Sequence, residues 1–417
     1  MSESPAPPVR GPVGVMLPLD LPVGEVLPYV RRAEELGFDQ VWVVEDLGWR
    51  GGVAQAATVL AATKNLTVGI GIMPAGARNV AFAAMELATL AQLHPGRLIA
   101  GIGHGMPGWM RQVGSWPESP LTLIKEYARA LRLLIAGEPG PENGRYVRCE
   151  GVVLTEIPDI VPPVILGVRG PKSQAVAGEV ADGLLLAEPA APAYITASLR
   201  NLGASANPRE TVVYDAAAVD DDEEAALSRV RAALESVGEP QWAAHIDPLP
   251  FAEELHAHRA ASPDARHFAR TMPADWVRQL SIAGTPAQAR AAIDARHAAG
   301  ATSVVLARRA PTPWPPSTPS PAHCPTGTEL DAPRPKGTDP HDHRPPPHRA
   351  LRPLRGHRPP PTPGRPGEDG RPLPHLRRRL HHGLLDPPPA LRRRPAHRIR
   401  VLDRRTARAV PRPGPAQ

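Results

Sequence analysis

The stretch GRLIAGIGHGMPGWM, residues 96–110, puts one imidazole at the end of a glycine-rich strand. A short apolar run, Leu98 to Ala100, leads into glycines at alternate positions, and His104 stands among them. A free imidazole has a pKa of ~6.5, so it can take up or release a proton near neutral pH. His104 is therefore a candidate catalytic acid or base. The alternatives are that it only hydrogen-bonds a bound molecule, or that it does neither.

Two carboxylates follow another apolar run. The stretch VVEDLGW places Glu45 and Asp46 directly after the β-rich residues 40–44. A carboxylate at the end of a buried strand can face a substrate, and it can equally cap the turn or helix that comes next. Both residues are candidate catalytic groups, with capping as the alternative.

The stretch GVRGPKS, residues 167–173, joins an apolar run to a helical segment. Glycine permits a tight turn, proline suits a first helical turn, and a helix N-terminus offers free N–H groups to an anion. We interpret the stretch as an anion site with phosphate as the usual guest; an ordinary strand-to-helix turn is the alternative. Its candidate ligand-binding residues are Gly167, Gly170, Pro171, Lys172 and Ser173.

Glycines recur near the ends of two neighbouring strands. Gly69 and Gly71 lie in the run 66–74, and Gly101, Gly103 and Gly105 lie in the run 97–105. Glycine in a strand marks a place where a backbone or a ligand comes close, so this pattern predicts a flat, bulky ligand over both strands. The GxGxG spacing is not the dinucleotide-binding fingerprint.

Eight apolar runs alternate with helical segments, at residues 13–18, 40–46, 66–74, 97–105, 162–170, 182–189, 211–219 and 302–309. Continuous apolar strands of this kind indicate a parallel sheet covered on both faces. Eight such units in about 300 residues predict an α/β fold, a closed (β/α)8 TIM barrel with its site at the carboxyl ends of the strands. An open doubly wound sheet is the alternative.

Two insertions interrupt the alternation. Residues 143–154 are expected to form a hairpin or an excursion, and residues 220–285 hold several helices. Such insertions usually cap the mouth of a barrel. Trp49, Trp109 and Met110 could wall an apolar substrate pocket there, or pack under a loop.

Charge divides the chain near residue 310. Residues 1–310 hold 27 Lys and Arg against 34 Asp and Glu, whereas residues 311–417 hold 21 against 8, with 28 of the 55 prolines. We therefore expect a disordered N-terminus (1–12), a barrel (13–310) and a low-complexity basic tail (311–417) without a packed core. The abrupt Pro/Arg/His/Ala bias resembles a GC-rich gene translated out of frame; a genuine disordered tail is the alternative.

Composition also bears on partners and location. The tail has no aromatic ring other than histidine after Trp314, which argues against nucleic-acid binding through base stacking. No apolar run approaches ~18 residues and the N-terminus lacks a signal-peptide core, so we expect no membrane span. Two cysteines cannot make a disulfide framework and fit the cytoplasm. No histidine cluster has the spacing of a metal site, and none is predicted.

The chain resembles the bacterial-luciferase-like superfamily of flavin- or deazaflavin-dependent oxidoreductases over about residues 12–308. The matching stretches are RRAEELGFDQVWVVED, GIMPAGARNVAFAAMELATLAQLHPGRLIAGIGHG, PKSQAVAGEVADG and AGTPAQARAAIDARHAAGATSVVL. GIGHGMPGWMRQVG is most similar to the branch related to methylenetetrahydromethanopterin reductase, whose members often use the deazaflavin coenzyme F-420.

The resemblance implies a tricyclic cofactor, coenzyme F-420 or FMN, over strands three and four. The ring face would be formed by Met73, Pro74 and Ala75, where the family often has a bulge or a non-proline cis peptide. Gly103, His104 and Gly105 would lie beside the ring. The phosphate arm would lie on the GVRGPKS residues.

The resemblance also bears on the reaction. Luciferases carry a catalytic histidine after strand two, where this chain has Glu45 and Asp46. In the deazaflavin-dependent sugar-phosphate dehydrogenases an acidic residue stands where His104 does, as proton donor or acceptor. We therefore expect hydride transfer between the cofactor and a small organic substrate, and a homodimer as the candidate assembly. An FMN-dependent monooxygenase and a non-catalytic flavin-binding barrel are the alternatives.

Overall fold

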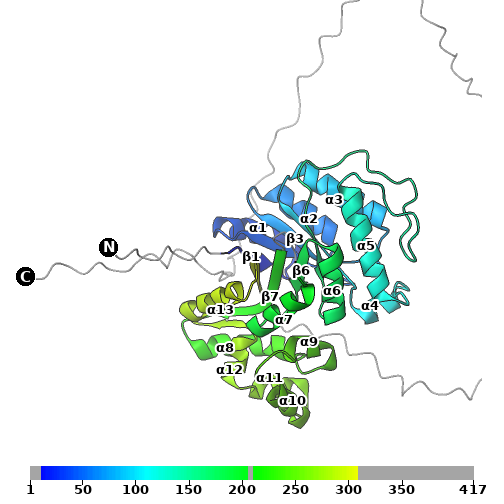
Figure 1. Cartoon of the computed structure of the whole chain (residues 1–417). Coiled ribbons are helices and arrows are strands. Elements are labelled where there is room, and N and C mark those ends of the chain that lie inside the picture. The colour runs from blue at the N-terminus through cyan, green and yellow to red at the C-terminus, as the bar shows by residue number, and fades with distance from the viewer. Residues whose placement is uncertain (1–10, 205–209, 309–417) are drawn as a thin grey trace, which may run out of the picture. The chain divides into compact units, whose positions relative to one another are not determined.

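The computed structural model describes residues 11–204 and 210–308. Nearly all of the expected disordered N-terminus, 1–12, and the whole expected tail, 311–417, lie outside the described residues. The expectations for those two segments therefore stay predictions. The described residues form the barrel region and its insertions (Figure 1).

Eight parallel strands close into a ring. Their bounds are β1 Val13–Met16, β2 Gln40–Val43, β3 Thr67–Pro74, β4 Leu98–Gly103, β5 Val164–Gly167, β6 Gly183–Leu186, β7 Glu210–Val219 and β9 Ser303–Ala307. Each strand pairs with the next, β7 pairs with β9, and β9 pairs with β1, which closes the barrel. The expected (β/α)8 barrel is thus confirmed, and the open doubly wound sheet is excluded.

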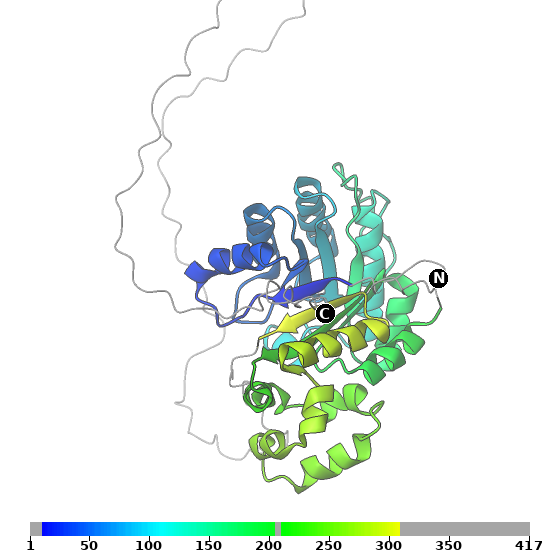
Figure 2. The same cartoon turned by 90° about the vertical axis from the view of Figure 1, so that its left-hand side faces the viewer.

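Helices surround this ring (Figure 1). Those that lie between barrel strands are α1 Val26–Glu35, α2 Gly52–Ala62, α3 Val80–Leu93, α4 Pro107–Gln112, α5 Pro120–Ile135, α6 Pro171–Val180 and α7 Pro192–Leu202, followed by α13 Pro286–Ala298. Figure 2 shows β9 and β1 facing the viewer between α13 and α1, with no helix of the described part over them.

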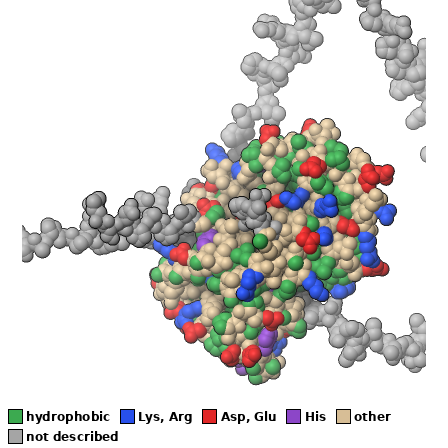
Figure 3. Space-filling model, in the orientation of Figure 1, with side chains coloured by type: hydrophobic (Ala, Val, Ile, Leu, Met, Phe, Trp, Pro, Cys, Tyr) green, Lys and Arg blue, Asp and Glu red, His purple; other side chains and the backbone are tan. Residues whose placement is uncertain are grey.

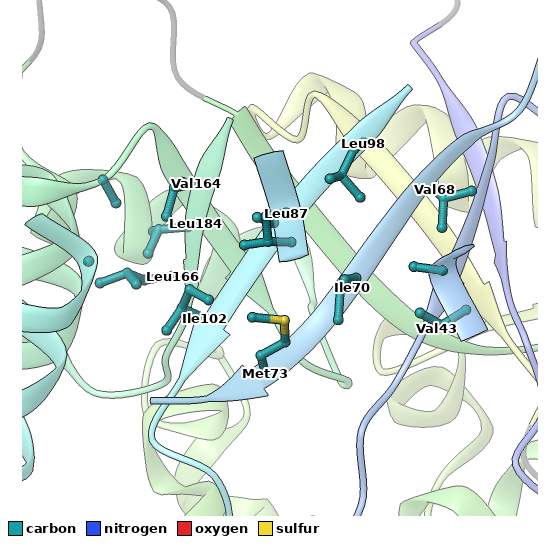
Figure 4. Close-up of a cluster of buried hydrophobic side chains, with 14 of the residues drawn as sticks. Val43, Val68, Ile70, Met73, Leu87, Leu98, Ile102, Val164, Leu166 and Leu184 are labelled. Atoms are coloured by element: carbon teal, nitrogen blue, oxygen red, sulfur yellow. The ribbon is translucent and has the colours of Figure 1, made fainter. Parts of the chain in front are cut away.

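Side chains alternate between two cores. Outward-facing residues such as Val43, Ile70, Leu98 and Ile102 pack with the surrounding helices in one large cluster (Figure 4). Inward-facing residues fill the barrel itself in a smaller cluster that includes Trp42 and Tyr214. The period-two alternation of a strand produces this division, because successive Cβ atoms point to opposite faces.

The strand glycines make room for protein groups. A Cβ built at Gly69 would lie 2.3 Å from the ring of Trp42, and one at Gly71 would lie 2.1 Å from the hydroxyl of Tyr214. These two aromatic rings meet edge to face, with centroids 5.6 Å apart. The expectation that the glycines of strand three were cleared for a flat ligand therefore needs correction, since aromatic side chains inside the barrel occupy the space.

A bulge in β3 uses the glycines of the next two strands. The β3–β4 register shifts between Ile70 and Met73, and the Gly71–Ile72 peptide bond within the shift is cis. A Cβ at Gly103 or Gly167 would lie 2.8 Å or 2.3 Å from Ile72 side-chain atoms. The glycines near the ends of β4 and β5 thus leave space for Ile72, which turns into the barrel.

The two insertions differ from each other. Within residues 143–154 the structure has turns and no strands, so this is an excursion and not a hairpin. The carboxylate of Glu126 on α5 holds it, accepting hydrogen bonds from the backbone N–H groups of Arg145, Tyr146 and Val147 at 2.8–3.1 Å.

The second insertion is a helical group with a core of its own. Its elements are α8 Glu223–Arg231, α9 Ala243–Ile246, α10 Ala252–Ala261, α11 Ala265–Thr271 and α12 Ala274–Gln279, with the short strand β8 Ile282–Gly284. Figure 1 shows these helices gathered beside β7 and α7. β8 was not expected from the sequence; it pairs with Ala217–Val219, the extension of β7 beyond the barrel.

A buried ion pair joins this region to the barrel. Asp215 on β7 accepts a hydrogen bond from Arg296 Nε on α13, and both side chains are 2% exposed or less. Asp215 also accepts from the backbone N–H of Ala190, and Arg296 donates to the carbonyl of Ser281. The pair therefore ties together β7, α13, the loop after β6 and the residue before β8.

Candidate active site

The histidine at the end of β4 meets the start of α6. His104 Nε2 lies 3.2 Å from Ser173 Oγ, although the residues are 69 positions apart. Burial lowers the pKa of His104 below its usual 6.5, so the imidazole is neutral at pH 7. The structure thus brings together two residues that the sequence had placed in one site, at the carboxyl ends of adjacent strands.

The first turn of α6 is open to a ligand. Gly170 is the N-cap residue and Pro171 is the first helical residue, and no side chain caps this end. The N–H groups of Lys172 and Ser173 have no acceptor within the helix, as in the first turn of any helix. A Cβ at Gly170 would meet nothing within 4 Å. The donors and the free space together fit a phosphate group.

One correction concerns Gly170 itself. Its φ is −86° and its ψ is 155°, an extended conformation that any residue adopts. Glycine is therefore not required for the turn, contrary to the expectation from the sequence. What the glycine provides is the absence of a side chain beside the helix N-terminus.

Glu45 has two partners in the structure. Its carboxylate accepts a hydrogen bond at 2.7 Å from the N–H of Gly52, in the first turn of α2, and two at 3.0 Å from Arg78 Nη2. The capping alternative is thus realised for Glu45, and a catalytic role stays a prediction. Asp46 is half-buried, and its carbonyl accepts from the N–H of Trp49 at 3.0 Å.

The expected ring face is built differently from the sequence expectation. The side chains of Met73 and Ala75 are buried in the outer core, so only their backbone atoms can border a ligand. The side chain that enters the barrel at the bulge is that of Ile72. Pro74 is half-buried beside Gly105, whose φ of +72° favours glycine.

The three candidate pocket residues have unlike environments. Met110 is 4% exposed and packs between Gly105 and Gly76. Cβ atoms added at these two glycines would lie 2.9–3.1 Å from its side chain. Met110 therefore follows the alternative of packing under a loop. Trp109 is half-buried in α4, and Trp49 is 48% exposed in the loop after β2. A pocket lined by both tryptophans stays a prediction.

Two polar residues near the mouth, Arg169 and His245, were not identified as candidates from the sequence. The guanidinium of Arg169, in the loop between β5 and α6, lies 4.0 Å above the ring of Trp242 from the helical insertion. His245, also from the insertion, hydrogen-bonds the carbonyl of Pro189 after β6 at 3.0 Å. The insertion therefore borders the carboxyl ends of β5 and β6, as expected. Arg169 stands inside GVRGPKS, and its charge was the available signal.

The surface of the described residues carries mixed charge. In the orientation of Figure 3, basic and acidic side chains are interspersed. Within residues 11–204 and 210–308, no helix is long and apolar enough to cross a membrane, and no three His, Cys, Asp or Glu residues form a group that could hold a metal ion.

The described residues thus form a (β/α)8 barrel that carries an uncapped helix N-terminus and His104 together at the carboxyl ends of its strands. The family model for luciferase-like monooxygenases matches residues 8–303, and the chain belongs to this family. It is an oxidoreductase, as the sequence resemblance implied.

Two relatives illustrate the match. The chain is 31% identical over 300 residues to 5,10-methylenetetrahydromethanopterin reductase of Methanolobus tindarius, covering 68% of this chain and 90% of the relative. It is 29% identical over 262 residues to F420-dependent glucose-6-phosphate dehydrogenase of Nakamurella multipartita, covering 57% and 77%.

A solved structure has the same fold. The coenzyme F420-dependent tetrahydromethanopterin reductase of Methanopyrus kandleri superposes with a TM-score of 0.61 at 21% identity, over 72% of this chain and 93% of that one.

Proposed function

We propose that this protein transfers hydride between a deazaflavin of the coenzyme F-420 type and a small organic substrate. The observation that carries the proposal is the meeting of His104 and Ser173 beside the uncapped N-terminus of α6. The cofactor class expected from the sequence, flavin or deazaflavin, agrees with the comparisons, and F-420 is favoured because a relative carries it in its name. FMN is the alternative.

The phosphate of the cofactor would bind at the first turn of α6. The free N–H groups and the positive end of the helix dipole attract an anion there, and Lys172 adds a charge from the exposed rim. Ser173 can donate to the same phosphate through its hydroxyl. A bound deazaflavin would supply the hydride acceptor or donor at the mouth of the barrel.

His104 would hold or move the proton that accompanies hydride transfer. Its neutral imidazole has an accepting nitrogen at pH 7, so it can take a proton from a substrate hydroxyl, and its position at the end of β4 places it beside the expected ring. We favour reduction or dehydrogenation over oxygen insertion because the two relatives described above are a reductase and a dehydrogenase. No histidine stands directly after β2, the position at which luciferases carry their catalytic histidine; this chain has Glu45 and Asp46 there.

Gly170 allows a direct test. Because its surroundings are open and its backbone is extended, Gly170→Val should fold, with only a small fall in Tm because valine is a poorer N-cap residue than glycine. The added side chain should block the anion and lower the affinity for F-420 or FMN at least tenfold, as measured by fluorescence titration. Lys172→Ala should weaken binding less, and mainly at low salt, because Lys172 is exposed.

The control is Gly108→Val, since a Cβ at Gly108 on α4 also meets nothing within 4 Å. The proposal requires that the wild-type protein binds one of the two cofactors and reduces or oxidises it with a substrate. Equal cofactor affinity in Gly170→Val and the wild type would contradict the proposal that the phosphate binds at the N-terminus of α6.

We further propose that the protein is a homodimer of the cytoplasm. The outer face of α3 exposes Phe82, Met85 and Leu93 by 66%, 52% and 68%, an apolar stripe suited to a second copy. Cys149 is a buried free thiol, which suits a reducing compartment. Sedimentation of Phe82→Asp beside the wild type tests the dimer, which this change should dissociate.

A further inference from the structure

The mouth of the barrel has apolar side chains at the carboxyl ends of β1 and β2. Met16 ends β1, Leu19 lies in the loop after it, and Val44 directly follows β2. All three pack against the cluster that fills the barrel. Met16 and Leu19 are half-buried and Val44 is 9% exposed, whereas Trp42 in the layer below is fully buried. Inward-facing side chains that keep some exposure line an opening, so these three residues form an apolar wall of the mouth.

The backbone acceptors behind this apolar wall are used within the protein. The hydroxyl of Tyr29 on α1 donates to the carbonyl of Met16 at 3.2 Å. The guanidinium of Arg50 donates to the carbonyls of Pro18 and Leu21 at 2.7 and 2.9 Å. The loop after β1 therefore presents its apolar side chains to the mouth, while its carbonyl groups are held by Tyr29 and Arg50.

Charged groups near the apolar wall are engaged elsewhere or stand at the rim. Glu45 accepts hydrogen bonds from Arg78 and from the N–H of Gly52. Asp20 and Arg308 are exposed and lie 4.0 Å from each other, where water can solvate both. The half-buried Asp46 leaves this side of the mouth with a candidate polar contact. The side is thus mainly apolar, with room for few polar contacts.

The position of the apolar wall makes it the substrate side of the mouth, an inference that rests on the proposed function. There the cofactor ring lies over β3 and β4 and the phosphate lies at α6. The helical insertion borders the carboxyl ends of β5 and β6. On the other side of the ring, β3 pairs with β2 and β2 with β1. A substrate beside the ring on that side therefore meets the apolar wall.

We propose that the apolar wall binds the body of the substrate, and that this substrate is apolar apart from one hydroxyl or carbonyl group. Further hydroxyl groups would lose their water at the wall without gaining a partner, which disfavours them. Oxidation of such an alcohol breaks one C–H and one O–H bond. The hydride passes to the oxidised deazaflavin and the proton to His104, and the carbonyl product leaves.

Matched small molecules test this substrate class. Cyclohexanol and benzyl alcohol represent it, whereas myo-inositol has the ring of cyclohexanol with a hydroxyl on every carbon, and glucose 6-phosphate adds charge. Saturation-transfer NMR on the full-length protein loaded with F-420 or FMN measures their binding without turnover. The two alcohols should bind about tenfold more tightly, as expected when a hydroxyl is desolvated without a partner. No binding of either alcohol, or equal or tighter binding of myo-inositol or glucose 6-phosphate, would overturn the proposal.

Two variants locate the binding at the apolar wall. Val44→Thr keeps the shape of the side chain and Met16→Gln keeps its length, but each adds polar atoms to the wall. Both should weaken cyclohexanol binding several-fold and leave the affinity for F-420 or FMN unchanged. Val153→Thr is the matched control, since Val153 is 49% exposed on the 143–154 excursion. Equal cyclohexanol binding by the wild type and both wall variants would contradict the assignment.

Cofactor titration separates this proposal from the proposed function. If the protein binds neither F-420 nor FMN, the proposed function fails, and the same molecules are compared on the cofactor-free protein. A preference for the two alcohols that Val44→Thr and Met16→Gln reduce supports the apolar wall there as well. If the cofactor binds but myo-inositol or glucose 6-phosphate is preferred, the substrate class is wrong and the proposed function stands.

Discussion

His104 shows how burial prepares a side chain for proton transfer. The surrounding protein holds the pKa of its imidazole below 6.5, so the neutral form persists to lower pH than it would in water. A histidine acts as a base only in its neutral form, so activity that depends on His104 as a base should persist below pH 6.5.

Replacement of this histidine distinguishes its two candidate roles. If His104 moves a proton, His104→Ala should lower kcat by ~10²–10⁴-fold with little change in cofactor affinity. If it only anchors the cofactor, affinity should fall first. Steady-state kinetics together with cofactor titration check this, with the exposed His256→Ala as the control. A variant with wild-type kcat and wild-type affinity would refute both roles.

At the scale of elements, the contact between the helical insertion and the barrel contains a buried histidine. His245 donates from Nδ1 to the carbonyl of Pro189, since a carbonyl only accepts, and its Nε2 has no partner among the described residues. Burial lowers its pKa to about 3. In the unfolded chain the histidine pKa is ~6.5. Between that pH and about 3 the unfolded chain therefore binds a proton at His245 that the folded protein does not bind.

This difference predicts acid sensitivity of a definite sign. Between pH ~6.5 and about 3 the unfolded state holds the extra proton, so the free energy of unfolding should fall as the pH falls, by about 1.4 kcal/mol per unit from His245 alone. Urea titrations at pH ~6 and pH ~5, both inside this window, measure it. His245→Phe should flatten this slope, and an unchanged slope in that variant would contradict the assignment.

The element pattern was largely predictable from the sequence, and its exceptions have physical causes. All eight barrel strands stand where their apolar runs predicted them, because a strand buried on both faces must be apolar throughout. β8 was not predicted because its three residues are too few to form a recognisable apolar run; it pairs only with the end of β7. At residues 145–147 no strand forms, because the N–H groups of Arg145, Tyr146 and Val147 donate to the carboxylate of Glu126 and not to a partner strand.

The candidate site was predictable in part. His104 and Ser173 were both named, because each follows a strand whose carboxyl end had to lie at the barrel mouth. The side of β3 on which the Met73 side chain lies was not predictable. A bulge shifts the inward–outward alternation of the strand by one residue, and it leaves no mark in the apolar pattern of the sequence. The partner of Glu45, Arg78, lies 33 residues away, beyond the reach of local patterns.

For the whole molecule, the end of the last barrel strand is the point where sequence and fold disagree. A (β/α)8 barrel places a helix after each strand, and β9 and β1 have no helix of the described part over them in Figure 2. The sequence after residue 310 is proline-rich, which opposes helix formation. If the tail is an out-of-frame product, another frame of the encoding DNA after codon 310 should give an amphipathic helix and then a stop.

That expectation can be checked by sequencing the gene and by comparing two proteins. A chain restored to the helix-coding frame should have a higher Tm than the chain as written, because a closing helix would add buried apolar contacts to the barrel. If no frame yields an amphipathic helix, the frameshift hypothesis is wrong and the basic tail is genuine.

The glycines inside the barrel have a consequence for the evolution of this chain. Gly69 is matched to Trp42, Gly71 to Tyr214, and Gly103 and Gly167 to Ile72, each pair sharing space that one member fills. Neither member can grow unless the other first becomes smaller. Substitutions at paired positions should therefore be correlated across homologues, and a lineage with alanine or serine at position 167 should carry a smaller residue at position 72.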